Sequence, residues 1–169
     1  MTGQNSFTVR RARLDDIAFL PEVEQSAAEA FRATAHGWVA DDEVTPTEAY
    51  PPLVFARSLW VAEEEGAIVG FVSVDIAADA LHILELAVAF PCQRRGIGRA
   101  LMRGAIQAAM ARGLPAVTLT TFRDVAFNAP FYRAMGFEAV EAPPPRLQAI
   151  LSAERGRGLE QRCAMRLTL

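Results

Sequence analysis

The sequence predicts one α/β (α+β) domain over residues 1–169, built on a mixed central β-sheet of about six to seven strands with helices on both faces. Three observations lead to this fold class. The length of 169 residues suits a single domain. Apolar residues make up 51% of the chain and charged residues 22%, as in ordinary globular proteins. Hairpin signals and strand–helix–strand crossovers both occur, so the sheet needs antiparallel as well as parallel neighbours.

The N-terminal third predicts one strand and two helices. Residues Phe7 to Arg10 alternate between apolar and polar side chains, which is the period of a strand. Asp15 can cap a helix whose apolar residues, from Ile17 to Phe31, recur close to every 3.6 positions. His36 to Thr45 contains a glycine and an acidic run, which indicates a loop. A second helix is favoured over Pro46 to Ser58, because proline suits the first helical turn.

The middle of the chain predicts a hairpin, another strand and a long helix. Two apolar runs, Leu59–Ala62 and Ala67–Ile76, flank the turn signal Glu64-Glu65-Gly66. The next strand spans Leu81–Phe90, and a loop connects it to a helix over about Gly98–Arg112. The buried face that we expect for this helix consists of Leu101, Ala105, Ala108 and Ala109.

The last third predicts strands and helices in alternation. The five elements span Ala116–Thr121, Ala126–Met135, Phe137–Val140, Arg146–Glu154 and Cys163–Leu169. We expect the final strand to lie at an edge of the sheet. An edge strand exposes unpaired backbone groups, so two copies of the chain could pair through this strand to form a homodimer.

Charge and composition exclude several classes of protein. Seventeen Lys and Arg against twenty Asp and Glu give a net charge of −3, whereas a sequence-blind nucleic-acid binder needs a basic excess. The most apolar stretch, Leu81–Phe90, is far shorter than the ~20 residues of a membrane span. Two distant cysteines, Cys92 and Cys163, and two histidines do not suit a zinc site, so no metal is predicted. The expected compartment is the reducing cytoplasm.

The loop that precedes the long helix has the character of an anion site. A strand runs into Gln93-Arg94-Arg95-Gly96-Ile97-Gly98, where the helix begins. Backbone N–H groups at a helix N-terminus are unpaired and carry about half a positive charge. Glycine lets a phosphate approach the main chain, and Arg94, Arg95 and Arg99 add charge. The sequence therefore predicts a cradle for a polyanion.

Two familiar phosphate-binding motifs do not match this loop. A Walker loop needs Gly-Lys-Ser or Gly-Lys-Thr, and the chain has neither. A dinucleotide fingerprint needs a small residue where Leu101 stands. On spacing alone, Gly96 and Gly98 could also serve only a tight strand-to-helix turn.

Taken together, two motifs resemble the GNAT superfamily of N-acetyltransferases. Gln93-x-x-Gly96-x-Gly98, after Leu86-Ala87-Val88, closely resembles the acetyl-CoA signature of that superfamily. Asn128–Phe137, about 40 residues later, is similar to its Phe-Tyr-x-x-x-Gly-Phe segment. The resemblance covers Leu59–Val140 and implies a GNAT fold whose strands splay at the acetyl-CoA site.

The resemblance also implies roles for individual residues, with acetyl-CoA as the co-substrate. The strand offers backbone groups to the pantetheine arm, the loop binds the pyrophosphate, and Tyr132 lies near the thioester sulfur, where it can donate a proton. The cofactor-binding positions implied in this way are Leu86, Ala87, Val88, Gln93, Arg94, Arg95, Gly96, Ile97, Gly98, Arg99 and Asn128. Many relatives place an asparagine seven residues before the tyrosine, where this chain has Val125. Helix capping and an active-site wall are therefore alternatives for Asn128.

An acetyltransferase must also remove a proton from its amine, because an alkyl ammonium has a pKa of about 10. The superfamily often carries its base on the strand before the loop, which implies His82. Histidine titrates close to neutrality and suits this task. Glu85 is the rival, because a bulge in the strand would exchange its two faces. A water relay is the third alternative.

The resulting prediction is an acyltransferase that moves acetyl from acetyl-CoA to a primary amine by direct attack in a ternary complex. The acceptor is a small-molecule amine or a peptide amine. One alternative is a CoA-binding sensor or interaction module without catalysis, against which the retained His82 and Tyr132 argue. Another is an interaction protein without a ligand, which would leave the cradle from Arg94 to Arg99 unexplained.

Overall fold

The structure is a computed structural model that describes residues 6–169. Its strands are β1 (Phe7–Arg11), β2 (Leu59–Glu64), β3 (Ala67–Ile76), β4 (Leu81–Val88), β5 (Ala116–Phe122), β6 (Glu138–Ala139) and β7 (Arg162–Thr168). They form one seven-stranded sheet in the order β1-β2-β3-β4-β5-β7-β6. β4 and β5 pair in parallel, whereas β1 with β2, β2 with β3 and β7 with both β5 and β6 pair antiparallel. The predicted mixed sheet is confirmed.

Residue contacts divide the described chain into two compact units. The first comprises the described residues up to Asp75 together with Leu84–Ala108. The second comprises Ile76–Ile83 and Ala109–Leu169, so β4 contributes to both units. The single domain over residues 1–169 and the splaying of the strands stay predictions.

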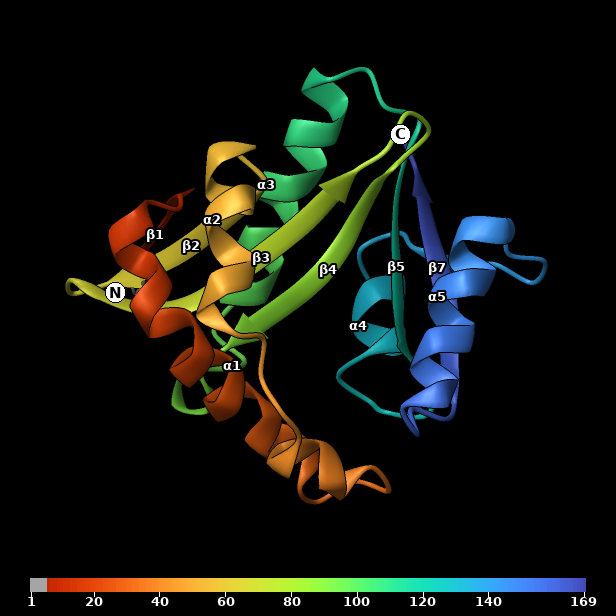
Figure 1. Cartoon of the computed structure of the whole chain (residues 1–169), viewed down its shortest axis with the longest axis horizontal. Coiled ribbons are helices and arrows are strands. Elements are labelled where there is room, and N and C mark those ends of the chain that lie inside the picture. Colours follow the sequence, from red (N-terminus) through yellow and green to blue (C-terminus); the bar gives the residue numbers. More distant parts are fainter. Residues whose placement is uncertain (1–5) are drawn as a thin grey trace. The chain divides into compact units, whose positions relative to one another are not determined.

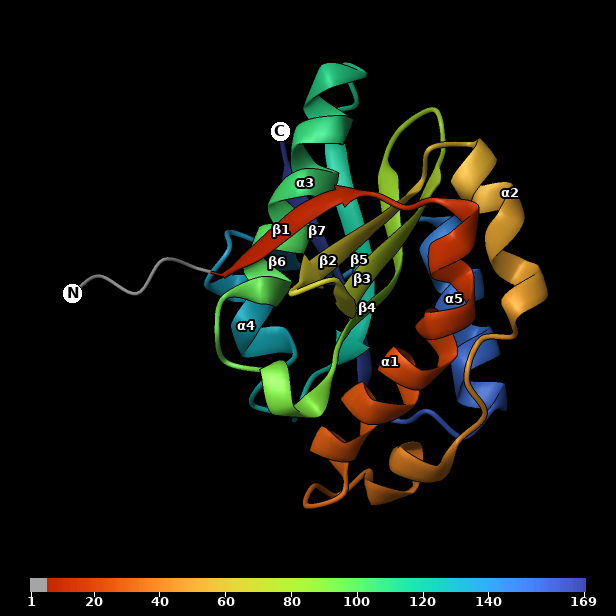
Figure 2. The same ribbon diagram turned by 90° about the vertical axis from the view of Figure 1, so that its left-hand side faces the viewer.

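The first unit places helices on both faces of its strands. Its helical segments are η1 (Leu14–Phe19), α1 (Leu20–Ala28), η2 (Glu29–Phe31), η3 (Gly37–Asp41), η4 (Thr47–Ala49), α2 (Tyr50–Phe55), η5 (Phe90–Cys92) and most of α3 (Ile97–Ala111). The helices α1 and α2 cover one face of β2 and β3, and α3 lies on the other (Figures 1 and 2). A core cluster between the strands, α1 and α2 includes Leu20, Val23, Tyr50, Leu59, Phe71 and Ala87.

The first helical region differs from the expected single helix capped by Asp15. A 3-10 segment, η1, comes first, and Asp16 rather than Asp15 organises its start. The Asp16 carboxylate accepts the backbone N–H of Arg13 at 2.7 Å and both terminal nitrogens of Arg10 at 2.8 and 2.9 Å. The α-helix then restarts at Leu20, with Pro21 in its first turn, because proline cannot donate the hydrogen bond that would continue the preceding segment.

The long helix α3 confirms its predicted buried face. Leu101, Ala105 and Ala109 are fully buried, and Ala108 is 8% exposed. Gly70 on β3 permits the close approach of α3. A Cβ atom there would lie 3.0 Å from the Ala87 carbonyl oxygen and 3.2 Å from the Leu101 side chain. The helix whose N-terminus forms the predicted cradle is therefore packed tightly on the sheet of this unit.

The second unit carries β5, β6, β7 and the start of β4. The helices α4 (Ala129–Arg133) and α5 (Pro145–Gly156) lie on opposite faces of β5 and β7 (Figures 1 and 2). A part-buried network joins α5 to the strands: Glu154 accepts hydrogen bonds from Thr120 on β5 at 2.5 Å and from Arg162 on β7 at 3.0 Å. The Arg162 guanidinium also lies over the Phe122 ring, 4.7 Å from its centroid.

Two expectations for the C-terminal third are corrected. The predicted helix Ala126–Met135 is the shorter α4, because a turn closed by the Asn128 N–H to the Val125 carbonyl precedes it and Gly136, at φ 96°, ends it. The final strand is not an edge strand, since β7 lies between β5 and β6. Because β7 is paired on both sides, the structure does not support a homodimer that forms through this strand. None of the helices formed by residues 6–169 is both long and apolar enough to cross a membrane.

Candidate functional site

The loop between β4 and α3 has the geometry of an anion cradle. η5 follows the strand, and residues 93–96 lead into α3 at Ile97. Two residues of this loop adopt left-handed backbone conformations, Arg94 at φ 62° and Gly96 at φ 85°. Left-handed residues alternating with others turn successive N–H groups towards one side, which makes a concave anion-binding surface. The Ala100 N–H donates to the Gly96 carbonyl at 3.0 Å, so the N–H groups of the first helical turn, from Ile97 to Arg99, have no acceptor within the helix. The Gln93 N–H, in contrast, donates to the Phe90 carbonyl at 3.3 Å.

The arginines of the loop are held in different ways. Arg95 donates to Glu64 on β2 in a two-pronged ion pair, with one contact of 2.9 Å, and the Arg95 guanidinium holds the pKa of that carboxyl below its usual range. Arg94 is exposed and Arg99 is half-buried. Within residues 6–169, neither Arg94 nor Arg99 makes an ion pair. These two arginines therefore keep their charge available to a ligand, whereas Arg95 is committed to the hairpin.

Gln93, at the start of the loop, directs its side chain into the protein. Its amide nitrogen donates to the Val88 carbonyl at 3.0 Å and to the Ala27 carbonyl at 3.3 Å. The Phe90 N–H donates to the Ser26 hydroxyl at 3.0 Å. The end of β4, the loop and the last turn of α1 are thus joined by three hydrogen bonds.

Acidic groups gather on the face of β4 that carries α1 and α2. Ala87 belongs to the core cluster under these helices, and Glu85, two residues earlier, shares its face. Tyr50 is buried there, and its hydroxyl donates to Glu24 at 3.1 Å. Burial, together with the charges of Glu24 and Glu85, raises the pKa of Tyr50 well above its usual value. Glu24 also accepts the backbone N–H of Thr45 at 3.1 Å.

Sequence reasoning selected Glu85 but missed Glu24, Tyr50 and Ser26. These three lie in the least distinctive part of the sequence, and only the packing of α1 and α2 on the sheet brings them to the site. The doublet Pro51-Pro52 indicates a helix start after Tyr50, but it carries no information on the partner of the tyrosine hydroxyl.

The remaining predicted residues, His82, Asn128 and Tyr132, belong to the second unit. His82 is 3% exposed, and its Nδ1 lies 2.9 Å from the Thr118 hydroxyl. Asn128 occupies the N-cap position of α4 without a capping hydrogen bond from its side chain, which removes the helix-capping alternative. Tyr132 is 9% exposed, and its ring packs edge-on against Phe131 and Phe137, with centroids 5.0 and 5.9 Å away.

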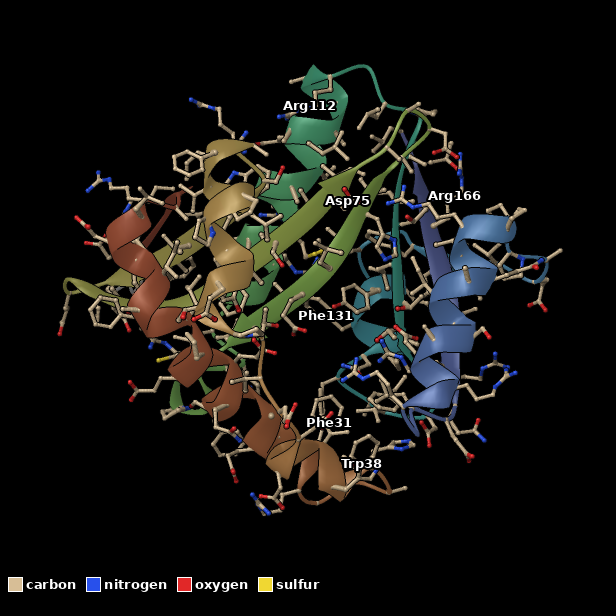
Figure 3. All side chains as sticks on the ribbon, viewed as in Figure 1. Phe31, Trp38, Asp75, Arg112, Phe131 and Arg166 are labelled. Carbon is tan, nitrogen blue, oxygen red and sulfur yellow. The ribbon has the colours of Figure 1, made fainter. Side chains whose placement is uncertain are left out.

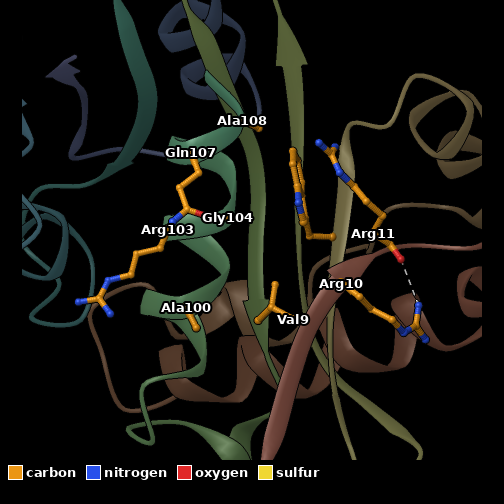
Figure 4. Close-up of a pocket in the computed structure, with 9 residues that line it drawn as sticks. Val9, Arg10, Arg11, Ala100, Arg103, Gly104, Gln107 and Ala108 are labelled. Atoms are coloured by element: carbon orange, nitrogen blue, oxygen red, sulfur yellow. Dashed lines mark hydrogen bonds between the residues drawn. The ribbon is translucent and has the colours of Figure 1, made fainter. Parts of the chain in front are cut away.

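The first unit also contains a hollow of about 560 Å³ between β1, β2 and α3 (Figure 4). Although three arginines line it, two are already engaged: Arg10 pairs with Asp16 and Glu63, and the Arg11 guanidinium stacks on Trp60 at 3.9 Å. Arg103 extends away from the hollow in Figure 4. The positive charge therefore does not converge there as it does at the loop before α3. Within residues 6–169, no cluster of His, Cys, Asp and Glu side chains could hold a metal ion.

Comparison with known proteins agrees with the loop, the long helix and the tyrosine segment. The model of the acetyltransferase (GNAT) family matches residues 13–137. This chain belongs to the acetyltransferase (GNAT) family. The resemblance predicted from its two motifs is confirmed, and membership of this family supports an acyltransferase.

Individual relatives of this GNAT chain agree in sequence and in fold. N-acetyltransferase family 8 member 3 of Rattus norvegicus is 35% identical over 85 residues, which are 47% of this chain and 37% of the rat protein. The match thus spans little more than a third of that relative. PaiA N-acetyltransferase of Thermoplasma acidophilum, solved with coenzyme A, superposes with a TM-score of 0.74 at 17% identity, covering 97% of this chain and 99% of its own. YncA of Salmonella typhimurium, solved with acetyl-CoA, gives 0.69 at 22% identity, covering 97% and 94%. These superpositions establish the GNAT fold.

Proposed function

We propose that this GNAT chain is an N-acetyltransferase that moves an acetyl group from acetyl-CoA to a primary amine by direct attack in a ternary complex. The observation that carries the proposal is the loop Gln93–Gly98, whose left-handed Arg94 and Gly96 turn backbone N–H groups outward at the start of α3. The solved structures from Thermoplasma acidophilum and Salmonella typhimurium hold coenzyme A and acetyl-CoA, which fits this choice of co-substrate.

The cofactor side of the proposed site uses backbone more than side chains. The N–H groups from Arg94 to Arg99 bind the pyrophosphate, and the exposed Arg94 and half-buried Arg99 add positive charge. Arg95 acts on the ligand only at longer range, because Glu64 already holds its guanidinium. The strand residues Leu86–Val88 offer backbone groups to the pantetheine arm, and one of their N–H groups stabilises the oxyanion of the tetrahedral intermediate.

The acceptor side is acidic. Glu24 and Glu85 lie on the α1 and α2 face of the first unit and both act on the Tyr50 hydroxyl. Two carboxylates beside a largely apolar core attract a cation, so a protonated amine is the acceptor class that fits. The acceptor is a small-molecule amine or a peptide amine. It carries a positive charge next to the nitrogen that attacks the thioester.

For proton removal, Glu85 is the first candidate and His82 the second. Glu85 is half-buried on the acidic face, whereas His82 is almost fully buried against Thr118. A group that keeps access to solvent can pass the proton on after each turnover. Tyr132 is proposed to protonate the departing thiolate, and its ring, fixed by Phe131 and Phe137, would give the hydroxyl a defined position.

The test is mass spectrometry of the purified protein with acetyl-CoA and a panel of amines that contains spermidine, a peptide with a free N-terminus and a peptide with an internal lysine. We expect acetylation of at least one amine and equimolar release of coenzyme A. The matched control is Gly98→Val, which should release far less coenzyme A. Coenzyme A binding without transfer to any amine would instead indicate a non-catalytic CoA-binding module, and absence of binding would indicate an interaction protein.

A further inference from the structure

Gln93 uses its side-chain donors inside the protein rather than towards the cradle. A carboxamide nitrogen carries two N–H groups. The contacts of 3.0 Å to the Val88 carbonyl and 3.3 Å to the Ala27 carbonyl engage both of them. The side-chain nitrogen therefore has no donor left for a phosphate, and the contribution of Gln93 to the cofactor site is indirect.

The last turn of α1 receives this contact together with a second one from the loop. Ser26, next to Ala27, accepts the Phe90 N–H at 3.0 Å. The loop is thus attached to α1 at two consecutive residues. A ligand that fixes the backbone of the loop would fix the last turn of α1 at the same time.

The same turn of α1 holds the segment that follows the helix. The Gln25 side-chain amide donates to the Ala40 carbonyl in η3 at 2.7 Å, and Glu24 accepts the Thr45 N–H at 3.1 Å. Successive helical residues point about 100° apart, so the four residues from Glu24 to Ala27 can serve neighbours on opposite sides. The contacts form a continuous chain from the cradle through Gln93 and α1 to residues 37–45.

We propose that Gln93 is a positioning residue that links occupancy of the cradle to the ordering of α1 and of residues 37–45. This inference rests on the proposed binding of coenzyme A at the loop. A ligand that orders the loop lowers the entropic cost of ordering every segment attached to it, and the coupling is reciprocal. Because Glu24 on the acidic face lies in the same turn, acetyl-CoA would organise the amine site before the amine arrives.

The test is hydrogen exchange followed by mass spectrometry, with and without coenzyme A, on the full chain. In the wild-type protein we expect coenzyme A to slow exchange in three segments: residues 93–98, residues 26–31 and residues 37–45. Gln93→Met keeps the length of the side chain and removes both donors. It should retain the protection of residues 93–98 and lose most of that in the other two segments, a reduction of about 3-fold or more in the protection conferred by the ligand.

Three further variants serve as a matched control, a rescue and an independent test of the contacts. Gln107→Met makes the same replacement at an exposed glutamine of α3 and should behave as the wild type. Gln93→Lys, whose ammonium can donate to both carbonyls, should restore part of the coupling. Gln25→Met should leave residues 26–31 protected and lower the protection of residues 37–45 in part, because Glu24 still accepts the Thr45 N–H. This variant tests the chain of contacts even if Gln93→Met does not fold.

The outcomes separate the inference from the function on which it rests. Protection of residues 93–98 alone in the wild-type protein, or identical protection of all segments in Gln93→Met, would overturn the role of Gln93 while leaving coenzyme A binding intact. A wild-type protein in which coenzyme A protects none of the three segments would overturn the proposed cofactor site, and the positioning role with it.

Discussion

At the residue scale, the backbone at the start of α3 decides whether an anion can approach. Gly98 stands in the first turn of the helix. We expect a side chain added there to keep an anion away from the backbone N–H groups of this turn. Gly98→Val should therefore weaken acetyl-CoA binding on the order of 10-fold or more while the protein stays folded. Calorimetric titration measures the affinity. Gly104→Ala, whose added Cβ would lie 3.6 Å from Trp60, is a control that we expect to bind normally. Unchanged affinity in folded Gly98→Val would exclude the pyrophosphate assignment.

The identity of the base can be read from two single substitutions. If Glu85 removes the proton, Glu85→Gln should lower turnover roughly 10²–10⁴-fold near neutral pH. The loss should shrink at high pH, because the amine then deprotonates without help. His82→Ala should show a smaller, pH-independent loss that reflects its buried contact with Thr118. The reverse pattern in the pH–rate profiles would assign the base to His82, and no pH-dependent loss in either variant would leave a water relay.

The Tyr132 hydroxyl can be tested without disturbing the ring. Tyr132→Phe keeps the edge-on packing with Phe131 and Phe137 and removes only the proton donor. Turnover should fall about 10-fold or more, with the affinity for acetyl-CoA nearly unchanged. A phenol with a pKa near 10 is a modest acid for a thiolate, so the benefit would come from position. Full activity would mean that solvent protonates the thiolate, whereas an equal loss of binding would make Tyr132 a wall of the cofactor site.

At the element scale, Arg10 joins three segments of the first unit. From β1 it reaches Asp16 on η1 and Glu63 on β2, each at 2.8 Å at its closest. The hydrogen bond with Arg10 holds the pKa of Asp16 below its usual range. A carboxyl whose pKa is lower in the folded than in the unfolded state stabilises the protein above the unfolded pKa of about 3.9. This contribution is lost as the pH falls through the folded pKa.

Asp16→Asn should therefore lower the free energy of unfolding at pH 7 by about 1–3 kcal/mol, since the charge-assisted bonds to Arg10 disappear. Urea unfolding at pH 7 and at pH 3 measures the difference, which should be smaller at the lower pH. Asp15→Asn, at the exposed neighbouring position, should stay within about 0.5 kcal/mol of the wild type. A destabilisation by Asp16→Asn that did not change with pH would indicate lost packing rather than a lost ion pair.

The elements that the sequence predicted well are those whose signals are local. The hairpin turn at Glu65 and Gly66, both left-handed, follows from residue types at the turn itself, and so does the helix start after Gly96. The start of the first helix could not be settled in this way. Asp15 and Asp16 are equally able to cap, and the choice of Asp16 depends on Arg10, which arrives from β1.

In the candidate site, too, the features with a local sequence signal could be predicted and those that depend on distant segments could not. The cradle could be predicted because its glycines, arginines and helix start lie in one segment, Gln93–Arg99. The partners of Gln93 could not, because they are carbonyl groups of alanine and valine, and a backbone carbonyl leaves no trace in residue type. The position of β7 was wrong for a related reason. The strand at Phe137–Val140 was itself predicted, but residue types do not show which neighbour a strand pairs with, and here β6 pairs with the outer side of β7.

At the scale of the whole molecule, ligand binding should raise the free energy of unfolding. A ligand that binds only the folded state at 100 times its Kd adds about 2.7 kcal/mol to the free energy of unfolding. For a protein of this size, that corresponds to a rise in Tm of several degrees, about 5 °C or more. We therefore expect saturating acetyl-CoA to raise the Tm measured by calorimetry. A single transition with and without the ligand would also support one domain over residues 1–169, because two independent units would melt separately.

The contribution of the nucleotide part of the ligand, which includes the pyrophosphate, can be tested with a truncated ligand. Pantetheine keeps the arm that is expected to pair with Leu86–Val88 but lacks the pyrophosphate and the phosphorylated adenosine. If the N–H groups before Ala100 and the charges of Arg94 and Arg99 bind the pyrophosphate, pantetheine should give little or no rise in Tm at the same concentration. The rise produced by coenzyme A should also shrink with added salt, since these arginines are at least partly exposed. Equal shifts for pantetheine and coenzyme A would show that the arm alone holds the ligand, and the left-handed conformations of Arg94 and Gly96 would then serve only the turn into α3.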